Sequence, residues 1–153
     1  MRILIQRVLS ASVDIDGIRK SAIAGGLLIL VGICDEDTDE DIVSLCQKIV
    51  KLRIFDDADG VMNLPITEIP DAGILVVSQF TLMASTRKGN RPSYIHASRP
   101  DIAIPMYEKF VARLSDLFGH PVQTGQFGAN MQVSLVNDGP VTIFMDSHLR
   151  DQF

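Results

Sequence analysis

Long hydrophobic runs are scarce in this chain of 153 residues. The longest apolar stretch, Ile23 to Cys34, covers about 12 residues, whereas a helix that crosses a membrane needs about 20. The stretch fits a buried strand, so we expect no membrane partner. Because Met1 and Arg2 lead directly into strand-like residues without an apolar leader segment, we also expect no secretory signal.

Cysteine is rare as well, and the familiar catalytic signatures are absent. Cys34 and Cys46 form no CxxC pair and no cysteine–histidine metal spacing, which favours reduced thiols in the cytoplasm. His96, His120 and His148 are far apart and belong to no metal motif. The chain also lacks a P-loop, a dinucleotide fingerprint and a G-x-S-x-G elbow. We therefore expect no metal and no cofactor, and a chemistry that depends on backbone groups and on the substrate.

No low-complexity segment or internal repeat is visible, and the composition is that of a globular protein, with 46% hydrophobic and 22% charged residues. At this length we predict one domain that spans residues 1–153. The net charge of −5 argues against nucleic-acid binding over the whole surface. The charges are uneven, however: six acids lie between Asp35 and Asp41, whereas Thr86 to Arg99 contains four cations and no acid. One face could still receive a phosphate backbone.

Hydrophobic periodicity divides the chain into short strands and two helices. Thr38, with Asp41 three residues later, predicts the N-terminus of the first helix. The order β-β-β-α-β-β-α-β-β-β indicates an α+β fold rather than a doubly wound sheet. The strands are expected at residues 2–8 together with 11–16, and at 19–24, 27–33, 53–55, 74–83, 122–127, 131–136 and 141–145.

The second helix contains a proline that complicates its start. Ser98 is typical of an N-cap and Gly119 of a stop. An interior proline removes a backbone hydrogen bond and clashes with the preceding turn, so we expect the long helix to begin near Pro105. The residues expected on its buried face are Ile102, Met106, Phe110, Leu114 and Leu117.

Polar residues interrupt the strand expected at residues 74–83. Side chains alternate along a strand, so Ser78 and Gln79 would lie on opposite faces. A buried amide or hydroxyl without a partner costs about 1–3 kcal/mol. These groups must therefore bond to neighbouring backbone or solvent, or lie where the strand reaches a cavity.

A second unusual stretch is Asn137-Asp138-Gly139-Pro140-Val141-Thr142. The strand-like runs on either side first suggest a hairpin, in which Asn-Asp-Gly could supply the positive φ angles of a tight turn. Pro140 has no N–H to donate to a sheet. A bond before proline is the one peptide link at which cis is inexpensive. A plain turn with a trans bond and a fixed turn with a cis bond both fit the sequence.

Taken together, Ser78-Gln79-Phe80-Thr81-Leu82 and residues 137–142 resemble the two signature motifs of the D-aminoacyl-tRNA deacylases. Family-like sequence also occurs in family order at residues 5–8, 53–55, 62–64, 91–93, 123–125 and 131–135. The resemblance implies an α+β fold with mainly antiparallel, barrel-like sheets in β/β/α layers and two main helices. It also implies a cytoplasmic homodimer whose nucleic-acid partner is tRNA rather than DNA. Such an enzyme hydrolyses the ester that joins a D-amino acid, or glycine mischarged on alanine tRNA, to the tRNA.

The resemblance further implies roles for single residues. The catalytic segment is Ser78, Gln79, Phe80 and Thr81. The backbone N–H groups of Gln79, Phe80 and Thr81 hold the oxyanion, Ser78 positions the substrate and Phe80 packs near the terminal adenosine. The tRNA 2′-OH activates the water, so Thr81 is a site residue rather than a nucleophile.

Selectivity is implied to come from Gly139 and Pro140, which enter the partner subunit's pocket through a cis bond and reject L-amino acids. Arg7, Met131 and Asn137 would support that pocket. Our own candidates for contact with the phosphates of the tRNA acceptor stem lie in the basic connection between Ser85 and Ser98, and are Arg87, Lys88 and Arg91.

Two alternatives from other classes fit the sequence. One is a noncatalytic, dimeric tRNA-binding module with the same scaffold. The other is an esterase for small molecules with Ser78 or Thr81 as nucleophile. Residues 83–86 and Asn90 look less typical of the family, and residues 148–153 look like an extension.

Overall fold

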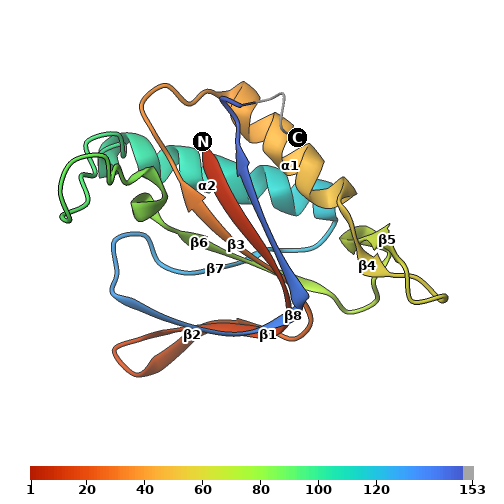
Figure 1. Cartoon of the computed structure of the whole chain (residues 1–153). Helices are drawn as coiled ribbons and strands as arrows, with labels where there is room; N and C mark the ends of the chain where they lie inside the picture. Colours follow the sequence, from red (N-terminus) through yellow and green to blue (C-terminus); the bar gives the residue numbers. More distant parts are fainter. Residues whose placement is uncertain (150–153) are drawn as a thin grey trace.

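In the computed structural model, which describes residues 1–149, a curved sheet is covered by two helices on one side (Figure 1). The strand order is β2-β1-β3-β6-β7, and β8 pairs with β1; β4 and β5 form a separate two-stranded sheet. The strands are β1 (Arg2–Ile15), β2 (Ile18–Ile23), β3 (Gly26–Gly32), β4 (Arg53–Asp56), β5 (Met62–Pro65), β6 (Gly73–Ser78), β7 (Gln123–Thr124) and β8 (Met131–Asp146). The helices are α1 (Asp39–Lys51) and α2 (Pro100–Phe118), with 3₁₀ turns at Ile66–Glu68 and Phe80–Met83.

Two long antiparallel strands give the sheet its barrel-like curvature. The first half of β1 pairs with β3 and with the end of β8, and the second half pairs with β2 and with the start of β8. Register shifts near Val8 bend both strands where they exchange neighbours. The ladders β3/β6 and β6/β7 are parallel. The predicted fold class, with mainly antiparallel sheets and two main helices, is confirmed.

Apolar side chains form two cores on the two faces of the sheet. The larger core lies between the sheet and the two helices and includes the fully buried Phe110 and Leu45. The smaller core lies on the other face and comprises Val8, Ala11, Val13, Leu28, Leu75 and Val77. Because Leu75 and Val77 pack on one face and Val76 on the other, β6 is apolar throughout, as expected of a strand covered on both sides.

The first helix begins as predicted, but the start predicted for the second helix is wrong. Thr38 precedes α1, and the Asp41 carboxylate accepts a hydrogen bond from the Thr38 backbone N–H at 2.7 Å. Helix α2 begins at Pro100 after Arg99, so neither the Ser98 cap nor the start near Pro105 is correct. Pro105 lies inside the helix on its exposed face, where water can bond the carbonyl that lacks a partner.

The buried face of α2 also differs from the expectation. Phe110 and Leu114 are buried as predicted, whereas Ile102 is 44% exposed. The buried residues near its start are Ala103 and Tyr107, and the Tyr107 hydroxyl donates a 2.8 Å hydrogen bond to the Val76 carbonyl. Burial raises the pKa of Tyr107, so this hydroxyl remains a donor. Tyr107 can be buried because the Val76 carbonyl accepts a hydrogen bond from its hydroxyl. The spacing of apolar residues along the helix does not reveal such an acceptor.

Candidate active site

The segment Ser78–Thr81 begins where β6 ends, not in the middle of a strand. The strand expected at residues 74–83 stops at Ser78, and Phe80–Met83 form a 3₁₀ turn with Gln79 as its N-cap. The alternation of faces assumed for residues 78–81 is therefore wrong. The fold instead agrees with the other alternative, in which these polar residues lie where the end of the strand reaches a cavity.

The turn is anchored to β3 by backbone contacts. The Gln79 N–H donates to the Val31 carbonyl at 2.7 Å, and the Gln79 carbonyl accepts from Leu82 at 3.1 Å. Gly32 allows this close approach, because a Cβ there would lie 2.9 Å from Leu82 Cβ and 3.0 Å from the Gln79 oxygen. The N–H groups of Phe80 and Thr81 open the 3₁₀ turn and have no acceptor within it. Two backbone donors thus remain at the end of β6.

The side chains of this segment are held differently from one another. The Gln79 side-chain amide donates to the Thr81 hydroxyl. Phe80 is 55% exposed, and its ring meets the ring of Tyr94 edge to face, with centroids 5.1 Å apart. Tyr94 was not among the predicted site residues, because it lies 14 positions further along the chain in an irregular segment.

A cavity of about 290 Å³ lies beside this segment. Residues 77–80 form one wall, and residues 127–131 with Val133 form the other. Met131 lines the cavity, and its sulfur accepts a hydrogen bond from the Gln126 N–H at 3.3 Å. The turn at residues 127–130 was missed from sequence, since no polar motif marks it. Gly139 and Pro140 are not among the lining residues.

The stretch around Gly139-Pro140 is a bulge in one continuous strand, so the hairpin suggested by sequence is wrong. Strand β8 runs through residues 131–146, and β1 pairs with it on both sides of the bulge: Val8 faces Asn137 and Gln6 faces Thr142. The Gly139-Pro140 peptide bond is cis, and Gly139 has a φ of +120°. Both residues are exposed.

Arg7 and Asn137 fix the base of this bulge. The buried Arg7 guanidinium donates to the Asp138 carbonyl at 3.3 Å, lies 3.0 Å from the Asp138 carboxylate and donates to the Ile54 carbonyl in β4 at 2.6 Å. The Asn137 side-chain amide donates to the carbonyls of Arg7 and Val141, each at 3.0 Å. Hydrogen bonds made by Arg7 of β1 and by Asn137 of β8 itself therefore hold the base of the bulge, and Gly139-Pro140 lie at the surface.

Comparison with known proteins identifies the family. A family model described as D-Tyr-tRNA(Tyr) deacylase matches residues 4–146. A Porphyromonas gingivalis protein named D-aminoacyl-tRNA deacylase is 61% identical over 151 residues, which cover 99% of this chain and 100% of that protein.

This chain belongs to the D-aminoacyl-tRNA deacylase family. The prediction of a hydrolytic enzyme of this family is thereby confirmed. A solved structure described as c-Myc DNA Unwinding Element Binding Protein is 38% identical, with a TM-score of 0.89 over 95% of this chain and 98% of that chain. A second, described as a probable eukaryotic D-amino acid tRNA deacylase, is 19% identical with a TM-score of 0.80 over 94% and 97%, and shows the shared fold.

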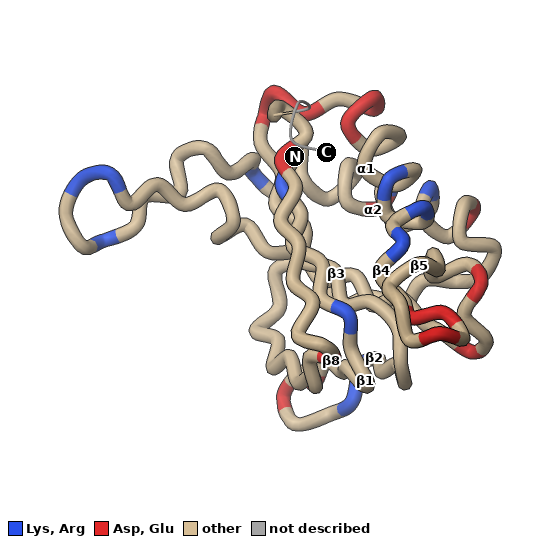
Figure 2. Tube along the Cα trace, turned by 45° about the vertical axis from the view of Figure 1, so that its right-hand side comes forward, with Lys and Arg blue, Asp and Glu red and all other residues tan. Residues whose placement is uncertain are grey.

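The basic connection of this deacylase-family chain projects from the body of the molecule (Figure 2). Ser85 and Ser93 pair through backbone hydrogen bonds of 2.8 and 2.9 Å and close a loop, residues 85–93, that we call the basic loop. It exposes Arg87, Lys88 and Arg91, whereas the acidic residues gather elsewhere (Figure 2). The loop lies next to the turn of Phe80, since only Ala84 separates it from that turn, and Tyr94, which follows the loop, contacts Phe80. No helix within residues 1–149 is long and apolar enough to cross a membrane.

Proposed function

We propose that this chain hydrolyses the ester bond of D-aminoacyl-tRNA and releases the free D-amino acid and the tRNA. Family membership over nearly the whole chain carries this proposal. The cavity at the end of β6 supports it, because Ser78, Gln79 and Phe80 line this cavity and the N–H groups of Phe80 and Thr81 open the turn beside it. A noncatalytic tRNA-binding module would have no need of such donors beside a cavity.

The oxyanion of the tetrahedral intermediate is held by backbone N–H groups. Donors placed where negative charge develops are worth about 3–4 kcal/mol each. Of the three N–H groups considered from sequence, that of Gln79 is engaged by Val31, so the proposal narrows to Phe80 and Thr81. Ser78 positions the substrate, and the half-exposed Phe80 packs near the terminal adenosine.

Water activated by the tRNA 2′-OH, rather than a protein hydroxyl, attacks the ester in this proposal. A hydroxyl nucleophile needs a neighbouring base that takes its proton. Thr81 instead accepts a hydrogen bond from the Gln79 amide, which is not a base. This contact argues against the alternative of a small-molecule esterase with Thr81 as nucleophile.

Chiral selectivity, in our proposal, comes from Gly139-Pro140 of a second copy of the chain. The pair is absent from the lining of its own chain's cavity, so it would have to reach a cavity in a partner. Exposed apolar residues around the bulge, Leu9, Leu135 and Val136, supply a surface that a second chain could cover. The main-chain atoms of Gly139-Pro140 would clash with the side chain of an L-amino acid, whereas the side chain of a D-amino acid would point away from them. Glycine has no side chain, so glycine mischarged on alanine tRNA would also be hydrolysed.

The decisive experiment uses purified chain with matched D- and L-aminoacyl-tRNA and follows the release of free amino acid. We expect multiple turnover of the D-substrate and at least 100-fold slower release from the L-substrate. Binding of aminoacyl-tRNA without release from either would favour the noncatalytic module. Equal rates with the D- and the L-substrate would show a hydrolase without chiral selectivity, and would contradict the proposed role of Gly139-Pro140.

Analytical ultracentrifugation tests the dimer separately. The unchanged chain is expected to sediment as a dimer, and charged substitutions at Leu9 and Val136 are expected to yield a monomer with little activity. A monomer that retains full D-substrate turnover and selectivity would contradict the cross-subunit arrangement.

A further inference from the structure

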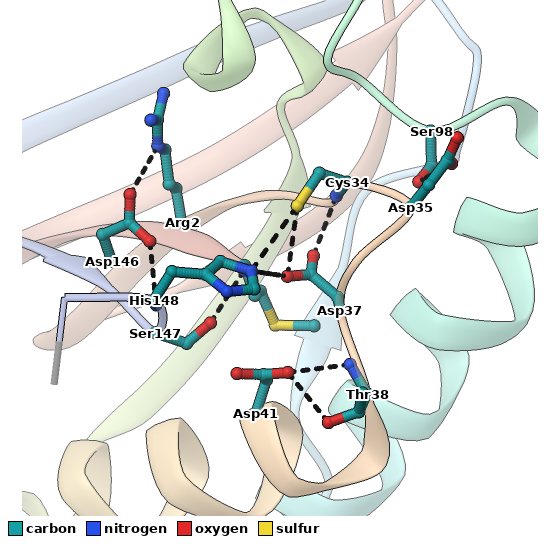
Figure 3. Close-up of polar contacts among 11 residues, drawn as sticks. Arg2, Cys34, Asp35, Asp37, Thr38, Asp41, Ser98, Asp146, Ser147 and His148 are labelled. Carbon is teal, nitrogen blue, oxygen red and sulfur yellow. Dashed lines mark hydrogen bonds and ion pairs between the residues drawn. The ribbon is translucent and has the colours of Figure 1, made fainter.

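Cys34, Asp37 and His148 form a cluster at the end of the molecule where β3 leaves the sheet, and the proposed hydrolysis does not use it (Figure 3). Cys34 Sγ lies 3.3 Å from Asp37 Oδ1 and 3.6 Å from His148 Nε2. Asp37 Oδ1 lies 2.8 Å from His148 Nε2. His148 is 111 positions from Asp37 and 114 from Cys34 in the sequence, yet the donor atoms of the three residues lie close together.

These distances are close to those of a tetrahedral metal site. Zn²⁺ binds thiolate sulfur at about 2.3 Å and imidazole nitrogen and carboxylate oxygen at about 2.0–2.2 Å. Tetrahedral angles then put sulfur about 3.6 Å from both nitrogen and oxygen, and nitrogen about 3.4 Å from oxygen. The sulfur–nitrogen distance already agrees. The distance from His148 Nε2 to Asp37 Oδ1, 2.8 Å, is shorter than the tetrahedral value. A small rotation of the His148 ring, which is 42% exposed, would lengthen it.

The backbone around the three donors is already fixed. The Asp37 N–H donates to the Cys34 carbonyl at 3.1 Å, and the Cys34 N–H donates to Asp37 Oδ2 at 2.8 Å. On the other side, the Ser147 N–H donates to the Met1 carbonyl at 2.8 Å. The ligands are therefore held in place before a cation binds, which lowers the entropy cost of binding.

The charges around the cluster favour a cation. Asp35, Asp41 and Asp146 lie on the segments that surround it (Figure 3), and Glu36 lines the neighbouring cavity. The cations nearby are Arg2, the α-amino group of Met1 and Arg87, which lines the same cavity. Arg2 is paired with Asp146 at 2.8 Å. The α-amino group contacts Asp37 Oδ1 and donates to Ser147 Oγ at 2.8 Å. A bound metal ion would replace this α-amino group on Oδ1, with a water as fourth ligand.

We propose that Cys34, Asp37 and His148 form a structural Zn²⁺ site that joins the turn after β3 to the chain after β8. Cys34 binds as the thiolate, and its proton passes to the buffer. A neighbouring cavity of about 710 Å³, lined by both Cys34 and His148, gives the ion a path from solvent. The cysteine and histidine spacings predicted no metal because the ligands are brought together only by the pairing of β1 with β3 and β8.

Cobalt titration of the chelator-treated full chain tests the site, because Co²⁺ bound to thiolate gives an absorption band that Zn²⁺ does not. We expect one Co²⁺ per chain with a thiolate band, displacement by Zn²⁺, and a rise of several degrees in Tm with Zn²⁺. Cys34→Ser is expected to remove the band. The matched control is Cys46→Ser, since this buried thiol in α1 donates to the Phe110 carbonyl instead and its loss is expected to leave the band unchanged.

His148→Ala is the second variant, and it changes a half-exposed side chain that the core does not need. It is expected to weaken Co²⁺ binding at least tenfold while the fold remains. The proposal is overturned if the unchanged chain gives no thiolate band, or if the band persists in Cys34→Ser. Should Cys34→Ser fail to fold, unchanged Co²⁺ affinity in His148→Ala would overturn it equally.

Discussion

Gly139→Ala probes the proposed chiral filter directly, because the backbone there leaves no room for a methyl group. A Cβ at Gly139 would lie 2.9 Å from both Arg7 Nη2 and Val141 Cγ2, and 3.2 Å from the Val141 nitrogen. Contacts under 3.0 Å force something to move. Arg7 cannot easily retreat, since its guanidinium is tied to the Ile54 carbonyl at 2.6 Å. The bulge itself must therefore shift.

The expected magnitude follows from the backbone angle and from this shift. A non-glycine residue in a region of φ and ψ that it rarely adopts costs about 1–3 kcal/mol, and Gly139 has a φ of +120°. A displacement near 1 Å in a group that orients substrate costs up to about 100-fold in rate. We expect the ratio of D- to L-substrate kcat/KM to fall at least tenfold, with a loss of about 1–3 kcal/mol in the free energy of unfolding.

The assay compares kcat/KM for matched D- and L-aminoacyl-tRNA, with urea unfolding of the same preparations. Gly17→Ala is the matched control, because Gly17 also has a positive φ, +76°, but no atom lies within 4 Å of its Cβ position. The control should lose stability without loss of selectivity. If Gly139→Ala keeps both rates within twofold of the unchanged chain, the proposed role of this bulge is refuted.

Three further predictions test other parts of the molecule. Ser78→Ala and Thr81→Val should each keep at least a tenth of the D-substrate turnover, and a loss of 1,000-fold in either would restore the nucleophile hypothesis. Glutamine at all three cations of the basic loop should reduce the slope of log K for tRNA against log salt by about 2–3, and DNA as competitor would report whether the loop distinguishes the two polyanions. The matched control replaces three cations outside the loop, Lys20, Lys48 and Lys51; an equal loss in slope there would contradict the assignment. Burial acts to raise the pKa of Asp41, but hydrogen bonds with Thr38 and Ser147 outweigh it and lower the pKa to about 2. Since the folded pKa is depressed, the stabilisation of about 2 kcal/mol is complete above pH 4 and is lost as the pH falls towards 2. Asp41→Asn should therefore lower the free energy of unfolding at pH 7 but not near pH 2, and a difference independent of pH in urea unfolding would refute this.

Local sequence signals predicted much of the fold. Thr38 with Asp41 marks the start of α1, and the apolar run near Leu28 marks a central strand, because caps and periodicity act over a few residues. The errors occurred where distant contacts decide. The strand of residues 74–83 stops at Ser78 because the Gln79 carbonyl accepts from the Leu82 N–H and so starts a 3₁₀ turn, and residues 131–146 form one strand because β1 pairs with both ends.

The same distinction applies to the candidate site. Gly139 and Pro140 can be identified from the sequence because the backbone angles and hydrogen bonds open to glycine and proline are local properties. Arg7 could be identified only through the family resemblance. That Arg7 reaches both Asp138 and Ile54 follows from the closure of the barrel, which no local pattern encodes.

A site made of backbone groups also changes which substitutions should matter. The proposed oxyanion donors are the N–H groups of Phe80 and Thr81, and they depend on the turn that Gly32 allows to approach β3. A side chain at Gly32 would push on Leu82 and on the Gln79 carbonyl at 2.9 and 3.0 Å and so displace these donors without touching substrate. Gly32→Ala should therefore lower the turnover of D-substrate more than Thr81→Val does, although Thr81 lies in the site and Gly32 does not. Comparison of kcat for the two variants checks this order, and the reverse order would show that the Thr81 side chain, rather than the backbone, carries the chemistry.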